Sequence, residues 1–212
     1  MCGKYKYILF DFDGTLVNSQ KGIFESIEYT LKKMNYKLGE SIDYSLFIGP
    51  PLKHSFLNIC NMDEDTADLA VKIFREEYEN KGVLNNELYD GVIDMLIELK
   101  RQNKIIAIAT SKPQIFVEKI LKQFELIDLF DLIIGTNLSD DHSDKERIIS
   151  EVINRLEVTD LQSVIMIGDR KYDILGGKEN SIATMGVLYG FGDYDELVKE
   201  SPDFIVSSAK EI

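Results

Sequence analysis

Two aspartates follow directly on the first apolar run of the chain. Residues 7–10, Tyr-Ile-Leu-Phe, lack the polar alternation of a half-exposed strand, so they predict a parallel strand buried on both faces. Asp11 and Asp13 come next, and a spacing of two puts both side chains on one side of an extended chain. Gly14 then permits a sharp turn. Two converging carboxylates suit a divalent cation and a nucleophile, although Asp-Gly is also an ordinary turn signal.

The chain after residue 89 alternates between helix-like and strand-like patterns. With amphipathic helical periodicity between them, apolar runs predict strands at residues 104–109, 132–134, 164–167, 182–188 and 204–206. Such alternation implies right-handed crossovers and a parallel sheet that helices cover on both faces. We therefore expect an α/β fold built on a doubly wound, Rossmann-like parallel sheet.

A helical insert separates the first strand from this alternating region. Apolar residues at three- and four-residue spacing predict helices at residues 18–34 and 66–78, with an irregular Gly-Pro-Pro run between them. We expect a small all-helical cap domain at residues 18–84, and an α/β core formed by residues 1–17 and 85–212.

Polar groups follow other predicted strands too. Ligands of open α/β sheets bind beyond the carboxyl ends of the strands, and Thr110, Ser111 and Asp169 stand at such ends. Asp173 returns to the same edge if it lies in the first turn of the next helix. Carboxylates gathered in one place repel each other unless a cation lies among them. Oxygen ligands with room for water favour Mg²⁺.

A lysine is expected at the same edge of the sheet. Ser143 and Glu146 have the spacing of a capping box, with Ser143 as N-cap of an amphipathic helix. Lys145 would then lie in the first turn, where the helix dipole disfavours a cation, so it needs a partner; solvated surface is the alternative. Lys112 is a rival for this role. We rank it second because Pro113 suggests a turn that leads away from the site.

These motifs resemble those of the haloacid dehalogenase-like superfamily. The run Asp11-Phe12-Asp13-Gly14-Thr15-Leu16-Val17 looks like motif I, Thr110 like motif II, Lys145 like motif III and Gly168-Asp169-Arg170-Lys171-Tyr172-Asp173 like motif IV. The insert is similar to the cap of the phosphoglycolate-phosphatase-like branch, whose members often carry a loop like Gly49-Pro50-Pro51. Glu146 departs from the proline that many relatives have after the motif III lysine.

The resemblance implies a magnesium-dependent phosphatase that acts on a small phosphate monoester, phosphoglycolate-like or a nucleoside monophosphate. Asp11 would attack phosphorus and form an aspartyl-phosphate, with Asp13 as general acid and later base. The phosphoryl group would be contacted by Gly14, Thr110, Ser111 and Lys145. The metal ligands would be Asp11, the main-chain carbonyl of Asp13, Asp169 and, directly or through water, Asp173.

Other functions share parts of this pattern. A phosphomutase of the same superfamily would keep every core motif and differ in the cap, where Lys53 and His54 are the candidate substrate contacts. A phosphonate hydrolase would form a Schiff base with a cap lysine such as Lys53, but enzymes of that kind lack the second motif I aspartate. A dehalogenase would not need Asp13 either. A non-enzymatic binding module is disfavoured because the motif residues are all present.

Composition restricts the partners and the compartment. The 212 residues carry 24 basic and 37 acidic side chains, and the net charge of −13 repels nucleic-acid polymers and anionic membranes. Cys2 and Cys60 are too few for a disulfide framework. No leader-like segment opens the chain, and no apolar run reaches the ~18 residues that a membrane span needs. We expect a cytoplasmic monomer or homodimer whose ligand is a small phosphate ester.

Overall fold

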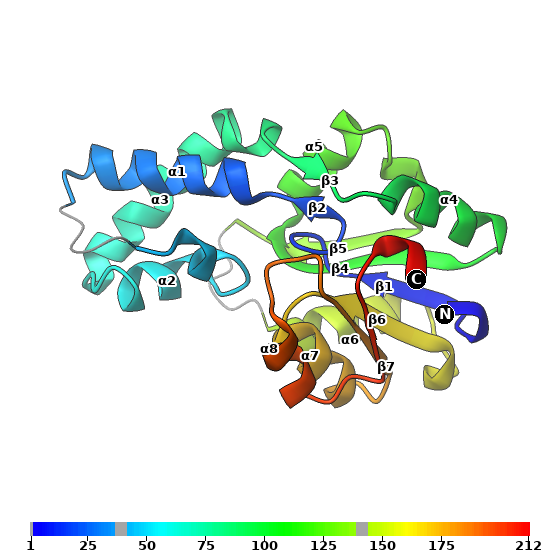
Figure 1. Ribbon diagram of the computed structural model, residues 1–212. Coiled ribbons are helices and arrows are strands. Elements are labelled where there is room, and N and C mark those ends of the chain that lie inside the picture. The colour runs from blue at the N-terminus through cyan, green and yellow to red at the C-terminus, as the bar shows by residue number, and fades with distance from the viewer. Residues whose placement is uncertain (1, 37–41, 139–143) are drawn as a thin grey trace. The chain divides into compact units, whose positions relative to one another are not determined.

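The sheet of this protein is parallel and six-stranded. The computed structural model describes residues 2–36, 42–138 and 144–212. Its main sheet has the order β5-β4-β1-β6-β7-β8, and a second sheet pairs β2 with β3 (Figure 1). The strands are β1 (Tyr7–Phe10), β2 (Val17–Asn18), β3 (Glu87–Leu88), β4 (Ile105–Pro113), β5 (Leu132–Thr136), β6 (Val164–Gly168), β7 (Ala183–Val187) and β8 (Phe204–Val206). The predicted doubly wound α/β fold is confirmed.

Helices follow the strands in turn. The α-helices are α1 (Gln20–Lys33), α2 (Leu52–Asn58), α3 (Glu64–Asn80), α4 (Val92–Arg101), α5 (Gln114–Gln123), α6 (Lys145–Arg155), α7 (Lys171–Glu179) and α8 (Tyr194–Lys199). Short 3-10 helices are η1 (Cys2–Lys4), η2 (Tyr44–Phe47), η3 (Gly82–Leu84), η4 (Ile127–Leu129), η5 (Leu161–Ser163) and η6 (Ala209–Glu211). Among the residues described, no helix combines the length and the apolar character that a bilayer crossing requires.

The chain divides into two compact units. Ser19–Glu87 forms a helical unit, and Met1–Asn18 with Leu88–Ile212 forms the core unit that contains the main sheet. In the helical unit α1 packs against α3, and the buried apolar residues of α1, Ile23, Ile27 and Leu31, recur at four-residue spacing. Asp63 begins α3 by accepting a hydrogen bond from the Thr66 N–H at 2.8 Å. The function of this unit as a cap stays a prediction.

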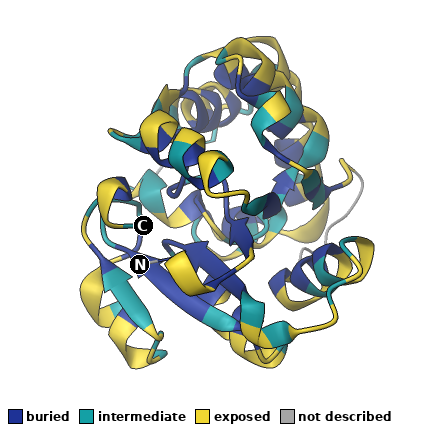
Figure 2. Ribbon diagram, turned by 90° about the vertical axis from the view of Figure 1, so that its right-hand side faces the viewer, coloured by how far each residue is buried: buried dark blue, intermediate teal, exposed yellow. Residues whose placement is uncertain are grey.

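The direction of winding reverses beside β1. The chain runs outward from β1 to β4 and β5, then crosses back to β6, β7 and β8. Helices α4 and α5 cover one face of the sheet, and α6 and α7 cover the other (Figure 1). The central strands β1 and β6 are buried along their whole length between these layers, and strands coloured dark blue are seen in Figure 2. This reversal is where open α/β sheets bind their ligands.

Alternation along β1 sends side chains to the two faces. Tyr7 and Leu9 pack with Ile149 and Val152 of α6. Asp11 follows with the same parity, so its side chain is directed to the face that α6 and α7 cover.

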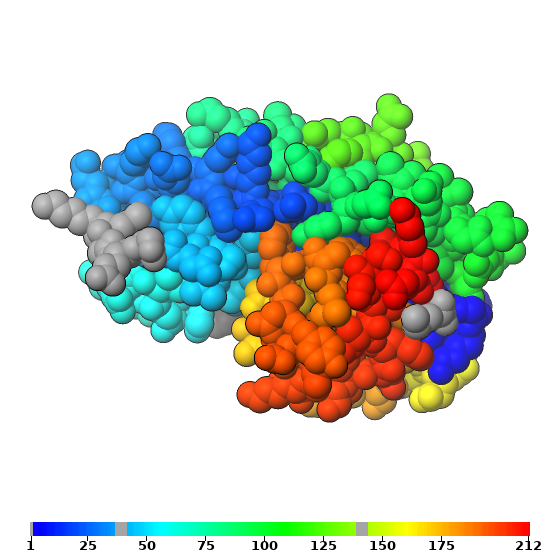
Figure 3. Space-filling model, viewed as in Figure 1, coloured from blue at the N-terminus to red at the C-terminus, as the bar shows by residue number. Residues whose placement is uncertain are grey.

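The carboxyl-terminal segment completes the core unit beside α4. Lys210 Nζ lies 3.0 Å from Asp90 Oδ2, and the Cys2 N–H donates to the Ile212 carbonyl at 3.1 Å. In Figure 3 the red carboxyl-terminal atoms lie against the green segment that contains α4. Cys2 and Ile212 are therefore tied to each other within the core unit.

Candidate active site

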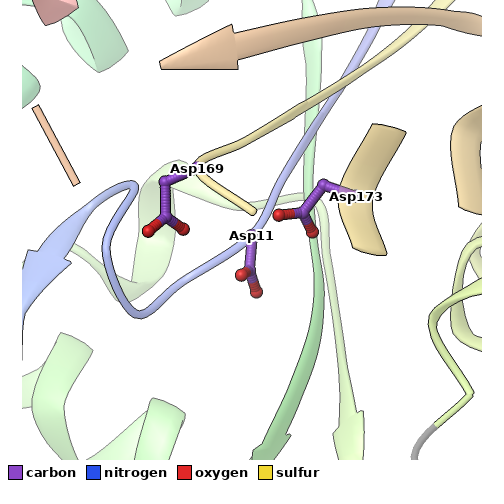
Figure 4. Close-up of side chains that lie close together, drawn as sticks. All are labelled: Asp11, Asp169 and Asp173. Carbon is purple, nitrogen blue, oxygen red and sulfur yellow. The ribbon is translucent and has the colours of Figure 1, made fainter. Parts of the chain in front are cut away.

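Three carboxylates meet at the carboxyl edge of the sheet. Asp11 follows β1, Asp169 follows β6, and Asp173 lies in the first turn of α7. Oxygens of the three lie within 4.8 Å of one another, and Figure 4 shows the side chains next to each other. Asp169 and Asp173 are fully buried. The tips of two adjacent strands and the start of the next helix thus converge on one point, although 158 residues separate Asp11 from Asp169 in the sequence.

Lys145 contacts this cluster of Asp11, Asp169 and Asp173. Its Nζ lies 2.8 Å from Asp11 Oδ1 and 2.8 Å from Asp173 Oδ1, and it donates to the Ala109 carbonyl at 3.1 Å. Burial by itself would lower the pKa of Lys145, but the charges of Asp11 and Asp173 outweigh burial and raise it. The lysine is therefore a buried cation, and the alternative of a solvated surface lysine is wrong.

The start of α6 differs from the sequence-based interpretation. Asp144 is the N-cap, and its carboxylate accepts a hydrogen bond from the Glu146 N–H at 3.1 Å. The predicted capping box from Ser143 to Glu146 is therefore wrong, and Ser143 itself lies outside the described residues. Aspartate and serine cap helices about equally well, so the sequence alone does not choose between the neighbouring positions. Lys145 keeps its place in the first turn with either N-cap.

The carboxylate cluster carries more negative charge than Lys145 neutralises. Burial raises the pKa of Asp169 well above its ordinary value, and the charges of Asp173 and Asp11 add to the effect. Burial also raises the pKa of Asp173 to about 6, opposed by Lys145 and reinforced by Asp11. Oδ1 of Asp11 and Oδ1 of Asp173 receive no aligned hydrogen bond despite the nearby lysine. A hard divalent cation such as Mg²⁺ fits this all-oxygen, under-neutralised set.

Gly14 gives Asp169 the space that it occupies. The Gly14 φ angle is +85°, in the left-handed region, and a Cβ built there would lie 2.2 Å from Asp169 Oδ2. Thr15 Oγ1 also lies 3.4 Å from Asp169 Oδ1, within reach of a weak hydrogen bond. The glycine is therefore required both for the turn after β1 and for the close approach of β6.

A loop after β7 supports Asp169 and was missed in the sequence. The Phe191 N–H donates to Asp169 Oδ2 at 2.7 Å. A Cβ at Gly190 would lie 2.4 Å from Asp169 Cβ, and one at Gly192 would lie 1.9 Å from the Asp169 carbonyl oxygen. Tyr189 anchors the loop by donating to the Thr15 carbonyl at 3.0 Å. A Gly-Phe-Gly run shortly after the predicted strand at residues 182–188 indicates a turn, but nothing in this run indicates a contact with Asp169.

Asp13 lies apart from the cluster and pairs with Lys112. Lys112 Nζ is 3.0 Å from each Asp13 carboxylate oxygen. The Asp13 carboxylate is not part of the group formed by Asp11, Asp169 and Asp173, because β1 ends at Phe10 and the chain turns instead of continuing as a strand. That Asp11 and Asp13 converge on one substrate group stays a prediction. The ranking of Lys112 rested on a turn at Pro113, but β4 continues through Pro113. Each aspartate of the first motif thus has its own lysine.

The tip of β4 contributes Thr110 and Ser111. Thr110 is 2% exposed, and its hydroxyl accepts a hydrogen bond from the Lys112 N–H at 3.3 Å. The Ser111 carbonyl accepts from Thr136 Oγ1 at 2.9 Å, which ties β4 to β5. These contacts place the backbone of both residues at the same sheet edge as the carboxylates. Their contact with a phosphoryl group stays a prediction.

The predicted cap contacts belong to the helical unit. Lys53 Nζ lies 2.8 Å from Glu64 and 2.7 Å from Asp68, and hydrogen bonds to these carboxylates raise the pKa of Lys53. His54 lies beside it in the first turn of α2, and its carbonyl accepts from Asn58 Nδ2 at 2.8 Å. The contact of Lys53 and His54 with a substrate also stays a prediction.

Comparisons with known proteins identify the family of this chain. The model of the haloacid dehalogenase-like hydrolase family matches residues 8–187. A 5'-nucleotidase of Pseudomonas aeruginosa is 35% identical over 94% of this chain and 90% of its own length. A phosphoglycolate phosphatase of Colwellia psychrerythraea is 30% identical over 97% of this chain and 94% of its own length. The crystal structure of a predicted phosphatase from Clostridium acetobutylicum has 40% identity, covers 98% of this chain and 95% of its own, and superposes with a TM-score of 0.89. With its matched family model, its sheet order and its relatives all in agreement, this chain belongs to the haloacid dehalogenase-like hydrolases and is an enzyme of the phosphatase kind.

Proposed function

We propose that this enzyme hydrolyses a small organic phosphate monoester through a phosphoryl group transferred to Asp11, with Mg²⁺ as its cofactor. The observation that carries the proposal is the position of Asp11. It is the one carboxylate of the cluster that is partly exposed, at 9%, while Asp169 and Asp173 are both at 0%. A nucleophile must reach the substrate, whereas groups that hold a metal can be buried behind it.

Asp11 is the nucleophile of this mechanism. Lys145, the first residue of α6, lies with its Nζ 2.8 Å from Asp11 Oδ1 and so holds this oxygen of the carboxylate in place. The other oxygen, Oδ2, attacks phosphorus, the bond to the leaving oxygen breaks, and the phosphoryl group is held on Asp11. Water then attacks the same phosphorus, and the bond to Asp11 breaks. Two displacements thus replace one difficult hydrolysis.

Asp13 moves the protons in both displacements. It gives a proton to the leaving alkoxide in the first and takes one from the attacking water in the second. Its side chain is 18% exposed, which leaves it accessible to a substrate oxygen and to water. The phosphoryl oxygens are contacted by Thr110, the amide of Ser111 and Lys145.

Asp11, Asp169 and Asp173 would hold Mg²⁺, together with the main-chain carbonyl of Asp13. Bound there, the ion would offset the negative charge of the phosphoryl oxygens and let one anion approach another. Backbone groups of the chain hold two of these metal ligands, Asp169 and Asp173, in position. Phe191 N–H, Gly14 and Gly190 hold Asp169 in place, and the Arg170 N–H donates to Asp173 Oδ2 at 3.1 Å.

Relatives suggest two substrate classes, a nucleoside monophosphate and a small phosphorylated acid such as phosphoglycolate. The 5'-nucleotidase shares more sequence with this chain, at 35% against 30%, so we place the nucleoside monophosphate first. A phosphomutase stays the second candidate because it would use the same core residues. A phosphonate hydrolase is disfavoured, since two carboxylates bind Lys53 and a charged ammonium does not form a Schiff base.

A substrate panel tests the proposal. Nucleoside monophosphates, phosphoglycolate and hexose phosphates are assayed for phosphate release with Mg²⁺ and with EDTA. We expect release from the monoesters with Mg²⁺ and its loss in EDTA. Activity that survives EDTA, or interconversion of hexose phosphate isomers without release of phosphate, would contradict the proposal, the latter in favour of the mutase.

A further inference from the structure

Lys112 forms an ion pair with Asp13, and the proposed mechanism assigns no role to this lysine. Its Nζ lies 3.0 Å from both oxygens of Asp13, and the Lys112 side chain is only 5% exposed. An ammonium that donates to both oxygens sets the plane of the carboxylate. A carboxylate has about four acceptor positions, so others remain for a further donor such as water.

The backbone of Lys112 is held as firmly as its ammonium. Ala109 pairs with Ile134 and Pro113 with Thr136, so four steps along β4 run beside two along β5. The register of the two strands therefore shifts between Ala109 and Pro113, the segment that contains Lys112. A Cβ at Gly135 would lie 2.6 Å from the Lys112 carbonyl oxygen, so the glycine lets β5 approach this backbone closely. The long side chain of Lys112 is therefore held at its backbone and at its ammonium group.

We propose that Lys112 is a positioning residue that holds the Asp13 carboxylate as the acceptor for the water of the second displacement. This inference rests on the proposed function. In that step the water oxygen bonds to phosphorus, the bond between phosphorus and Asp11 breaks with its electron pair returning to Asp11, and the water proton passes to Asp13. Because the ammonium binds both oxygens of Asp13, it fixes the direction in which their remaining acceptor positions point, and this orientation is what the incoming water requires.

The experiment isolates the second displacement with p-nitrophenyl phosphate, whose phenolate leaves without needing a proton. Turnover and the mass of the intact protein after acid quench are measured for Lys112→Met. We expect kcat to fall about tenfold to hundredfold, at the lower end of what a positioned base contributes, while the fraction of protein that carries phosphate rises. Lys122→Met, which changes an exposed lysine of α5, is the matched control and leaves both quantities unchanged.

A purely structural effect gives a different result. If Lys112 only stabilised the fold, its loss would lower kcat and the phosphorylated fraction together, and that outcome overturns the inference, as does an unchanged kcat. Asp13→Asn is the reference. If neither it nor the wild-type enzyme ever carries phosphate, the proposed function fails. If Asp13→Asn accumulates phosphate and Lys112→Met does not, only the role of Lys112 fails.

A double variant covers the case in which Lys112→Met does not fold because Asp13 is left unpaired. Asp13→Asn with Lys112→Met removes both charges of this ion pair, so Asp13 is not left as an unpaired carboxylate. If Lys112 acts only through Asp13, the double variant has the kcat of Asp13→Asn to within about twofold, because effects that pass through one residue do not add. A further tenfold loss in the double variant overturns the inference.

Discussion

The two aspartates of the first motif lie in opposite electrostatic surroundings. On the α6 and α7 side of β1, Lys145 pairs with Asp11 and Asp173, two of three carboxylates whose oxygens lie within 4.8 Å of each other. On the β4 side, Lys112 pairs with Asp13 through both carboxylate oxygens at 3.0 Å. Three carboxylates carry more negative charge than Lys145 neutralises, and this excess favours a bound cation. The pair of Lys112 and Asp13 has one charge of each sign. The two aspartates of one motif thus differ in the number of carboxylates around them.

Replacing the nucleophile tests the α6 side most severely. Asp11→Asn keeps the size of the side chain but removes the attacking oxygen, so we expect kcat to fall by about 10⁴-fold or more and no phosphate to remain on the protein after acid quench. Steady-state turnover and intact-protein mass measure this. If Asp11→Asn keeps wild-type turnover, Asp11 is not the nucleophile.

The two lysines are compared directly by their effect on stability. In metal-free protein, Lys145→Met leaves the buried Asp11 and Asp173 without the cation that contacts them, and we expect the free energy of unfolding to fall by about 3–5 kcal/mol. Lys112→Met unpairs Asp13, whose side chain is 18% exposed, so we expect a smaller loss, about 1–3 kcal/mol. Urea denaturation in EDTA measures both. Equal losses would contradict the difference between the two sides.

A substitution at Gly14 tests whether the space beside Asp169 is needed for stability and for Mg²⁺ binding. Gly14→Ala adds a Cβ in a left-handed conformation, 2.2 Å from Asp169 Oδ2, and we expect it to destabilise the protein by about 1–3 kcal/mol and to weaken Mg²⁺ binding. Gly3→Ala is the matched control, because nothing lies within 4 Å of its Cβ, and its effect should stay within about 0.5 kcal/mol. Thermal melting with and without Mg²⁺ measures both effects. Unchanged melting of Gly14→Ala would show that the turn relaxes.

The stabilisation by a bound metal ion is expected to depend on pH. The pKa of Asp173 is about 6 and that of Asp169 is raised as well, so protons compete with a cation at low pH. Because these pKa values lie above those of the unfolded chain, the metal-free protein loses stability as pH rises through about 6, and Mg²⁺ restores it there. At 100 times its Kd, Mg²⁺ should contribute ~2.7 kcal/mol at pH 7.5 and much less at pH 5.

Differential scanning calorimetry at the two pH values measures the Mg²⁺-dependent rise in Tm. Asp173→Asn is the control, since it removes one titrating ligand and should flatten the difference between pH 5 and pH 7.5. A rise in Tm of the same size at both pH values would mean that the cation does not bind at these carboxylates.

Much of the fold was readable from local patterns. Continuous apolar runs predicted every strand of the main sheet, because strands buried on both faces have no polar alternation to disguise them. Asp169 and Asp173 were predicted at one edge from strand ends and helix periodicity alone, and they lie together. The start of α6 was predicted less well, since Asp144 and Ser143 are both good N-caps and the sequence does not rank them.

The partners of the site residues were harder to predict. The pairing of Asp13 with Lys112 depends on a bulge in β4, which no local pattern of Thr-Ser-Lys-Pro indicates. The support of Asp169 by the Phe191 N–H depends on a loop 22 residues further on, whose glycines read as an ordinary turn. In both cases the contact is made by segments that follow different strands.

The amino-acid sequence by itself determined which strands form and which of their ends carry carboxylates, hydroxyls and lysines, because hydrophobic periodicity and motif order are local properties of the chain. Only the tertiary structure decided how those charges pair: Asp11 and Asp173 with Lys145, and Asp13 with Lys112. The physical reason is that a long lysine side chain reaches several partners, and the backbone turns, bulges and close glycine contacts around it select one.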